Sequence, residues 1–304
     1  MTDALHDGCL VSQELVGARY FPFKLDVFHR RPTRTIVVGS SRVLKISARS
    51  DERTFANVGY PGITAESVKT PFDALPAKPA QTVYLGVEAF WLNAHFVSPN
   101  PEPSNYQIAQ YLLSRATFEG AYKQVREAPY VLTRRWKRSQ IGNRCVIGRT
   151  FPSIAWNVDG SRTWSWELDP VHFARFHPAP FTRDLAVWRN GYYDHWTAID
   201  RERVRALDAA LADAQARGWR VIGFAPPEPP RYLRMLQTDP RLAPRWNAFL
   251  QVMPRLFRRH GFTWGGLWDG SALGCTPRDY PDDFHTDATC SERLRLALDA
   301  VAGR

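Results

Sequence analysis

Three short apolar runs constrain the possible folds of this 304-residue sequence more than any other feature. They occupy residues 34–39, 82–87 and 219–225, and all three are rich in β-branched and other large apolar residues. Continuous apolar character without alternation is typical of strands that are covered on both faces, as in a parallel sheet. We therefore expect an α/β fold in which helices cover both faces of a mostly parallel sheet, giving three α/β/α layers.

The clearest helical pattern lies just before the third run. Apolar residues over 200–218 are spaced three and four apart, with Asp200 placed as an N-cap and Gly218 as a stop. A helix followed by a short turn and a strand is an α/β crossover unit, which agrees with a parallel sheet. The same patterns predict further helices over 106–113, 244–260 and 289–301, with Pro254 kinking or interrupting the second of them, and a strand over 262–267.

Residues from about 100 to 200 interrupt this regular pattern. Within them, the Trp-rich stretch 153–193 has no clean helical or strand period. We interpret the segment as an irregular central insertion or lid within a single domain that spans residues 1–304.

The charge balance favours anionic partners, because 40 Lys and Arg residues face 30 Asp and Glu residues and leave a net charge of +10. The densest basic cluster, residues 134–138, has no nucleic-acid module around it, so we expect a solvated segment there and no specific nucleic-acid partner. No apolar run has the ~18 to 20 residues of a membrane span. Residues 1–15 lack the layout of an export signal, which predicts a cytoplasmic protein unless a segment upstream is missing.

Cysteine and glycine patterns point away from metal and nucleotide chemistry. Neither a Cys-x-x-Cys pair nor a phosphate-binding glycine motif occurs, and His172 and His177 have poor spacing for a metal site, so we expect no metal and no cofactor. We expect buried free thiols and leave open a disulfide between the last two of the four cysteines: Cys9, Cys145, Cys275 and Cys290.

The first apolar run ends in a motif that carries a candidate nucleophile. Its sequence Ile36-Val-Val-Gly-Ser-Ser-Arg places the Ser41 hydroxyl at the carboxyl edge of a parallel sheet, where α/β folds bind their ligands. The turn that follows can also expose backbone N–H groups that suit a developing oxyanion. The alternative is an ordinary turn after a strand.

A second candidate site lies just before the last predicted helix, in the sequence Tyr280-Pro-Asp-Asp-Phe-His. The carboxylate of Asp282 can fix the tautomer of His285 and support its positive charge while it takes a proton from a serine. Asp283 is expected to point away. The alternative is a loop histidine whose neighbours only cap the helix.

Together these motifs resemble the SGNH hydrolases, which have a flavodoxin-like fold and the same chain order. Gly-Ser-Ser ending at Ser41 resembles their first block, which implies that Ser41 is the nucleophile. Residues 55–62 resemble the second block, which implies an oxyanion hole formed by the N–H groups of Gly62 and Ser41. Asp282-x-x-His285 matches the fifth block, which implies that these two residues support the nucleophile. The ordered blocks span about residues 20–301.

The variant Gly-Ser-Ser-Arg resembles a subgroup linked to surface-polymer modification, such as proteins that D-alanylate teichoic acid or O-acetylate alginate. Ser40 stands where aspartate is usual, and Glu88 stands where the third block has an asparagine. An anionic Glu88 cannot donate to an oxyanion unless it is protonated, and whether Glu88 or Asn93, further along the chain, replaces this asparagine stays open. We treat Arg42, Glu88 and Asn93 as candidate substrate contacts, with a salt bridge as the alternative for Arg42.

The resemblance implies a serine-dependent esterase that works through an acyl-enzyme on a small acyl ester or an acylated carbohydrate. One alternative is an O-acyltransferase that modifies a cell-surface polysaccharide. Another is a catalytically silent polysaccharide-binding module, in which Trp156, Trp164 and Trp166 stack on sugar rings, although aromatic residues more often lie in the core. The oligomeric state stays open.

Overall fold

The structure is a computed structural model that describes most of the chain. It places residues 8–12, 20–29, 33–50, 52–75, 81–98, 137–141, 143–148, 154–171, 185–282 and 284–304. Several expectations lie outside the described residues: the helix over 106–113, the orientation of Asp283, the first three residues of the basic cluster, and both His172 and His177.

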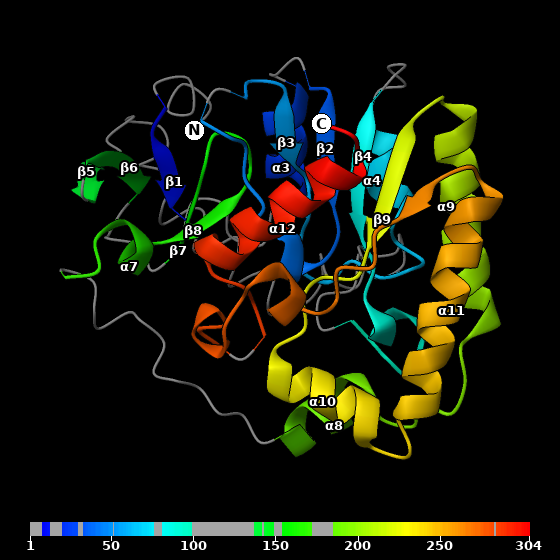
Figure 1. Ribbon diagram of the computed structural model, residues 1–304. Coiled ribbons are helices and arrows are strands. Elements are labelled where there is room, and N and C mark those ends of the chain that lie inside the picture. Colours follow the sequence, from blue (N-terminus) through cyan, green and yellow to red (C-terminus); the bar gives the residue numbers. More distant parts are fainter. Residues whose placement is uncertain are drawn as a thin grey trace, which may run out of the picture.

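A parallel five-stranded sheet forms the centre of the molecule (Figure 1). Its strands stand in the order β10-β9-β4-β2-β3, and the expected α/β class is confirmed. Along the chain, β3 is added on one side of β2, whereas β4, β9 and β10 are added in turn on its other side. The direction in which strands are added therefore reverses between β2 and β4. Ligands of open α/β sheets bind at such a switch point, outside the carboxyl ends of the strands. The strands are β2 (Thr35–Val38), β3 (Phe55–Asn57), β4 (Thr82–Gly86), β9 (Arg220–Phe224) and β10 (Thr263–Trp264).

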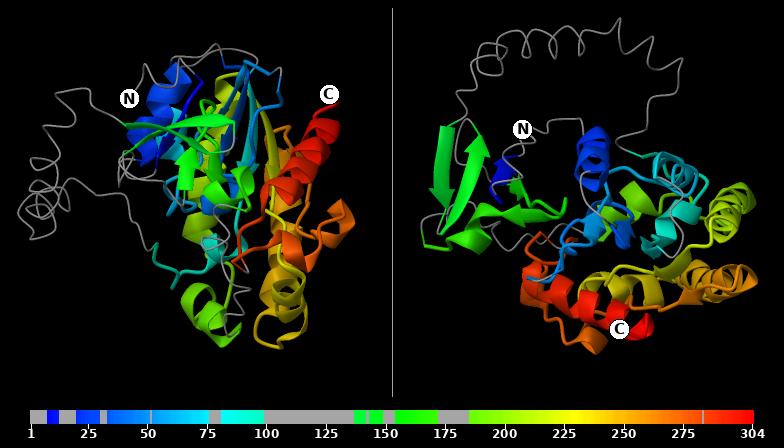
Figure 2. Two further views of the ribbon diagram at one scale, coloured as in Figure 1. Left: turned by 90° about the vertical axis from the view of Figure 1, so that its left-hand side faces the viewer. Right: turned by 90° about the horizontal axis from the view of Figure 1, so that it is seen from above.

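Helices cover both faces of this sheet and complete the three layers (Figure 2). On one face of the sheet, the core includes the aligned residues Ile36, Val83 and Val221. Four helices contribute apolar side chains to the same core. Val37 and Tyr84 point the other way and pack with Leu294 and Leu298 of the fifth helix. The four are α3 (Tyr20–His29), α4 (Lys69–Ala74), α9 (Arg201–Ala216) and α11 (Ala243–Arg259), and the fifth is α12 (Ala288–Val301).

Local chemistry sets the helix boundaries much as the sequence indicates. The Asp200 side chain accepts a hydrogen bond from the Arg203 N–H at 2.9 Å and starts α9, and Gly218 follows its end with φ of 68°. Helix α11 runs unbroken through Pro254, so the expected interruption is not seen. Even this helix lacks the apolar length that crossing a membrane requires, and so do the other helices of the described residues. The remaining helices of the main domain are α8 (Leu185–Tyr192) and α10 (Pro230–Thr238).

A second sheet lies beside the first and combines the start of the chain with residues 137–164. Strand β1 is its centre, pairing in parallel with β6 and antiparallel with β7. The sequence pattern missed these short strands, and the interpretation as one domain with an insertion stays a prediction. The strands are β1 (Leu10–Ser12), β5 (Lys137–Ile141), β6 (Arg144–Gly148), β7 (Ile154–Trp156) and β8 (Arg162–Trp164), followed by helix α7 (Ser165–Leu168).

The second sheet is fastened to the main one by backbone contacts. The Arg162 N–H donates to the Leu44 carbonyl at 2.7 Å, and the Asn57 N–H donates to the Asp159 carbonyl at 2.8 Å. Trp156 and Trp164 are buried in this region, which places them in the core and leaves them no face for a sugar ring.

All four cysteines form disulfides, Cys9 with Cys145 and Cys275 with Cys290. The expectation of free thiols is therefore wrong. The first pair could not be predicted from spacing along the chain, because only the sheet brings the two cysteines together. The parallel register that aligns Leu10 with Val146 places the two preceding residues side by side.

Two glycines at the carboxyl ends of β2 and β4 let the next turn sit close against the sheet. A Cβ atom on Gly39 would lie 2.9 Å from Val43 Cγ1, and one on Gly86 would lie 2.5 Å from the same atom. Gly39 also has a φ of 153°, which side-chain-bearing residues rarely adopt. Val43 ends the short 3₁₀ turn η1 (Ser41–Val43), so its close packing fixes the position of that turn.

Gly86→Ala should lower the free energy of unfolding by about 1 to 3 kcal/mol, because the added methyl group forces Val43 out of a packed position. Urea or thermal unfolding measures the change. Gly191→Ala in α8 is the matched control, since nothing lies within 4 Å of its added Cβ. Equal stability of Gly86→Ala and the control would contradict the close-packing argument.

Candidate active site

The turn after β2 presents the candidate nucleophile. Ser41 begins η1, and the Ser40 side chain precedes it as the N-cap, accepting a hydrogen bond from the Arg42 N–H at 3.2 Å. The Ser40 hydroxyl also donates to Glu88 Oε1 at 2.5 Å, which fastens the turn to the end of β4. Ser41 is half-buried at this edge of the sheet, as the sequence motif predicts.

The loop before α12 carries the candidate acid–base pair, and a single carboxylate, that of Asp282, both shapes this loop and holds the imidazole. Asp282 Oδ1 accepts backbone hydrogen bonds from Phe284 at 3.2 Å and from His285 at 2.7 Å. Asp282 Oδ2 accepts a hydrogen bond from His285 Nδ1 at 2.6 Å. One oxygen thus closes the turn and the other holds the ring, which explains the Asp-x-x-His spacing.

These two segments meet at the edge of the sheet. His285 Nε2 lies 2.8 Å from Ser41 Oγ although the residues are 244 positions apart in the chain. A carboxylate, an imidazole and a hydroxyl therefore stand in series, each within hydrogen-bond distance of the next. This is the geometry that activates a serine as a nucleophile.

Burial and charge set the protonation of the pair. Burial lowers the pKa of His285 below its ordinary value, against the opposing effect of Asp282, and the positive charge of Arg162 lowers it further. Burial alone would raise the pKa of Asp282, but its hydrogen bonds with His285 hold it well below its usual range. At neutral pH the imidazole is therefore neutral. Its proton lies on Nδ1 toward the carboxylate, and the Nε2 lone pair faces Ser41.

Arg42 points into the protein rather than toward a ligand. Its guanidinium is buried, and its Nη1 donates to Glu88 at 2.8 Å and to Glu228 at 2.7 Å. Its Nη2 donates to the Pro227 carbonyl at 2.6 Å, and the group lies over the Phe284 ring at 4.8 Å from the centroid. Protein groups bind these polar atoms of Arg42 and Glu88, so a substrate contact by either side chain stays a prediction that the packing does not favour. The salt-bridge alternative for Arg42 is what the structure contains.

Glu228 follows β9 at the same edge as Glu88 and was not predicted from the sequence pattern. Burial raises the pKa of Glu228 to about 7, against the opposing attraction of Arg42. A signal was present in the sequence: an acidic residue directly after the apolar run and its two prolines, Pro226 and Pro227, lies at the edge where the other candidate residues gather.

The Asn93 side chain is bound to backbone groups of the protein. Its Nδ2 donates to the carbonyls of Tyr192 at 3.2 Å and Asp194 at 2.9 Å, and its Oδ1 accepts from the His95 N–H at 3.1 Å. The side chain thus fastens two loops together, and the substrate contact expected of Asn93 stays a prediction. It follows the short 3₁₀ turn η2 (Ala89–Leu92).

The oxyanion hole stays a prediction. Gly62 lies in the turn after β3 with a φ of 92°, and its carbonyl accepts a hydrogen bond from the Ser98 hydroxyl at 2.8 Å. Within the described residues, the N–H groups of Gly62 and Ser41 donate to no other protein atom. Both groups are thus free to serve a ligand.

Glu167, from α7 beside the second sheet, supports both halves of the site, and nothing in the sequence pattern indicated it. Its Oε2 accepts hydrogen bonds from the Trp164 N–H at 2.9 Å and from the Lys45 side chain, shortly after the nucleophile turn. Its Oε1 accepts from the Ala288 N–H at 3.1 Å, at the start of α12. Burial lowers the pKa of Lys45 to about 7, although the attraction of Glu167 opposes this.

Comparisons with known proteins add little to this geometry. No protein-family model and no curated protein matches the chain. Among solved structures, the chain is similar to the lipase/acylhydrolase from Enterococcus faecalis, with 12% identity and a TM-score of 0.36 over 90% of this chain and 97% of that chain. No group of metal-ligating side chains is placed to hold an ion in the described part of the chain. The function proposed below rests on the contacts of Ser41 and His285.

The rate at which a fluorophosphonate labels Ser41 should fall with decreasing pH and reach half its maximum below pH 6.5. Protonated His285 cannot accept the serine proton, and its pKa lies below the ordinary 6.5. Arg162→Gln should move the midpoint upward, because a charge that lowers this pKa is removed. Labelling rates measured between pH 4 and 9 test both, and a wild-type midpoint above 6.5 would contradict the assignment.

Proposed function

We propose that this protein is a serine-dependent hydrolase of ester bonds that works through an acyl-enzyme. The supporting observation is the 2.8 Å contact between His285 Nε2 and Ser41 Oγ, with the opposite ring nitrogen bound to Asp282 at 2.6 Å. A catalytically silent module would need no such alignment. The substrate class that follows is a small acyl ester or an acylated carbohydrate.

In the first half-reaction, Ser41 Oγ attacks the ester carbonyl while its proton passes to His285 Nε2. The C–O bond to the alcohol then breaks, and His285 returns the proton to the departing alkoxide. Asp282 keeps the ring in the required tautomer and stabilises the imidazolium. In the second half-reaction, His285 takes a proton from water, which attacks the acyl-serine, and the proton returns to Ser41 as the carboxylic acid leaves.

The N–H groups of Ser41 and Gly62 are the proposed donors to the tetrahedral oxyanion. Neither Glu88 nor Asn93 can add a third, because both side chains are bound within the protein. Loss of one such donor raises the barrier by roughly 3 to 4 kcal/mol. The proposed enzyme is therefore slower than a relative with all three donors.

An O-acyltransferase is a second candidate, because a sugar hydroxyl in place of water would use the same residues. The basic net charge of +10 and the Gly-Ser-Ser-Arg motif favour it for an anionic surface polymer. The two candidates differ only in the acceptor that reaches the acyl-serine.

Ser41→Ala should abolish both fluorophosphonate labelling and turnover of a small aryl ester, with a loss of at least about 10³-fold, because the attacking oxygen is absent. Mass spectrometry of the labelled wild-type protein should place the adduct on Ser41. Ser271→Ala, on an exposed turn, is the matched control and should label normally. Unchanged turnover in Ser41→Ala, or an adduct elsewhere, would refute the proposal.

Incubation with an ester that carries a labelled acetyl group, in the presence of an anionic oligosaccharide, separates the two candidates. We expect most of the label to appear as free acetate, because water is the proposed acceptor. Chromatography of the products measures the partition. Label found mainly on the oligosaccharide would replace hydrolysis by acyl transfer while leaving the Ser41 chemistry intact.

A further inference from the structure

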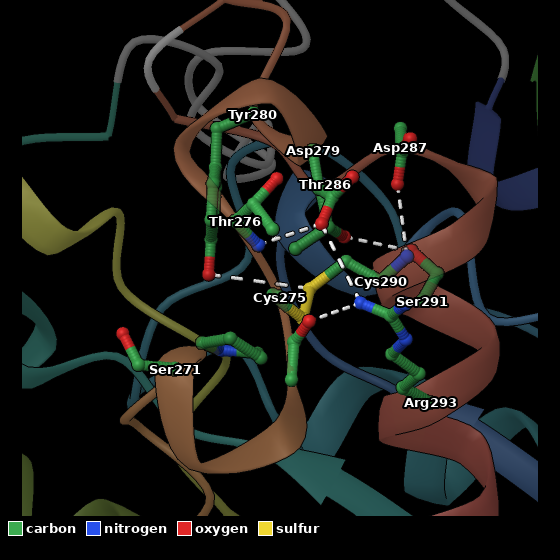
Figure 3. Close-up of a disulfide and its surroundings, with 12 residues drawn as sticks. Ser271, Cys275, Thr276, Asp279, Tyr280, Thr286, Asp287, Cys290, Ser291 and Arg293 are labelled. Carbon is green, nitrogen blue, oxygen red and sulfur yellow. Dashed lines mark hydrogen bonds and ion pairs between the residues drawn. A yellow bond between two sulfur atoms is a disulfide. The ribbon is translucent and has the colours of Figure 1, made fainter.

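The segment that carries Asp282 and His285 is closed into a ring by a disulfide between Cys275 and Cys290. Figure 3 shows this disulfide and its surroundings. Cys275 precedes this segment and Cys290 lies in the first turn of α12, with a sequence separation of 15 residues and a Cα–Cα distance of 5.3 Å. The acid–base pair thus lies between the two linked cysteines. The proposal that follows rests on the function proposed above.

Little regular structure supports this ring from within. Among the described residues, the ring contains the short turn η5 (Pro277–Asp279) and the first turn of α12, and no strand pairs with it. Hydrogen bonds hold it to itself: the Asp287 N–H donates to the Asp279 carbonyl at 2.7 Å, and the Asp279 carboxylate accepts from the Thr276 N–H at 2.7 Å. At one end of the ring the Cys275 N–H donates to the Gly270 carbonyl at 2.8 Å, and at the other end α12 begins. The disulfide joins these two ends covalently.

The linked cysteines lie in a small apolar cluster beneath the ring. Cys275 and Cys290 are buried together with Tyr280, whose hydroxyl lies 4.0 Å from Cys290 Sγ (Figure 3). Tyr280 precedes the Asp282 turn by two residues. Tyr280 thus connects both cysteines to the base of the turn that holds His285.

The other disulfide has no comparable position. Cys9 and Cys145 join β1 to β6, strands that already pair through Leu10 and Val146, and neither strand carries a residue of the candidate active site. The protein thus contains its own matched comparison, one disulfide at the acid–base loop and one in the second sheet.

We propose that the Cys275–Cys290 disulfide is a positioning element that holds His285 against Ser41, so that turnover depends on this bond being formed. A displacement of about 1 Å in a reacting group costs on the order of 10²-fold in rate. The Nε2–Oγ contact of 2.8 Å depends on a loop whose ends the disulfide fixes. Disulfide bonds persist in oxidising compartments, so we expect the active form of the protein to occur in an oxidising compartment.

Opening the bond is a balanced two-electron step. A dithiol reductant attacks one sulfur, the S–S bond breaks, and both cysteines become thiols while the reductant closes to its cyclic disulfide. Two protons and two electrons pass to the protein. The resulting thiols are small and weakly polar, so the buried cluster can retain them and the fold can persist.

The test compares Cys275→Ser/Cys290→Ser with Cys9→Ser/Cys145→Ser, using turnover of an aryl acetate and the fluorophosphonate labelling rate of Ser41. We expect kcat of the first variant to fall by about 10- to 100-fold with KM nearly unchanged, and kcat of the second to stay within about twofold of wild type. Circular dichroism and thermal unfolding establish that each variant is folded. Wild-type kcat in a folded Cys275→Ser/Cys290→Ser variant would overturn the proposal.

A second measurement covers variants that do not fold. Wild-type protein is reduced with a dithiol below its unfolding temperature, assayed, and then reoxidised. Loss and recovery of kcat should follow the Cys275–Cys290 bond in peptide maps and be independent of the Cys9–Cys145 bond. Retained activity after reduction of the loop disulfide overturns the inference alone. An oxidised wild type that neither turns over esters nor labels at Ser41 refutes the hydrolase proposal instead.

Discussion

The carboxyl edge of the sheet depends on the interactions of one buried group, the guanidinium of Arg42. It joins the nucleophile turn to Glu88 after β4, to Glu228 after β9, and to the Phe284 ring beside His285. A charge removed from water is tolerated only when its partners are all in place, and loss of one partner of a buried pair costs about 3 to 5 kcal/mol. The three strand ends and the acid–base loop therefore cannot shift independently. Because Arg42 directly follows Ser41, the position of the nucleophile is set by the same contacts.

This interaction also gives a physical reason for the two positions at which the sequence differs from the SGNH pattern that its motifs resemble. Ser40 stands in place of the usual aspartate, and Glu88 stands in place of the usual asparagine, and the two side chains bind each other. An aspartate at position 40 would set a second carboxylate against Glu88 and lose the donated hydrogen bond. With a serine there, Glu88 can accept from both the hydroxyl and Arg42. The exchange strengthens the support of the turn and removes a side-chain donor from the oxyanion site.

Sequence patterns predicted those parts of the molecule that local physics determines. Continuous apolar runs identified β2, β4 and β9, and the Asp-x-x-His spacing identified a turn that one carboxylate closes. The second sheet was missed because its strands are short and β1 has partners more than a hundred residues away, so no local period reveals it. The support from Glu228 and Glu167 was missed for the same reason: each role is defined by tertiary neighbours. Arg42 could be interpreted in two ways from sequence, and its burial between two carboxylates decides for the ion pair.

Convergence of Ser41 and His285 requires that two segments be fixed by separate means and then related to each other. The turn that carries Ser41 is fixed by the packing of Val43 against glycines and by Arg42, while α12 anchors the other segment through Leu294 and Leu298, which share one apolar cluster with Val43. Other groups link the two segments directly: Arg42 contacts Phe284, and Glu167 binds both Lys45 and the start of α12. Since productive geometry tolerates only about 0.5 Å of error, we expect these cross-connections, together with the loop disulfide, to affect reactivity as well as stability. The second sheet contributes none of the candidate reacting groups, but through the Glu167 carboxylate beside it the sheet helps to hold the two segments in place.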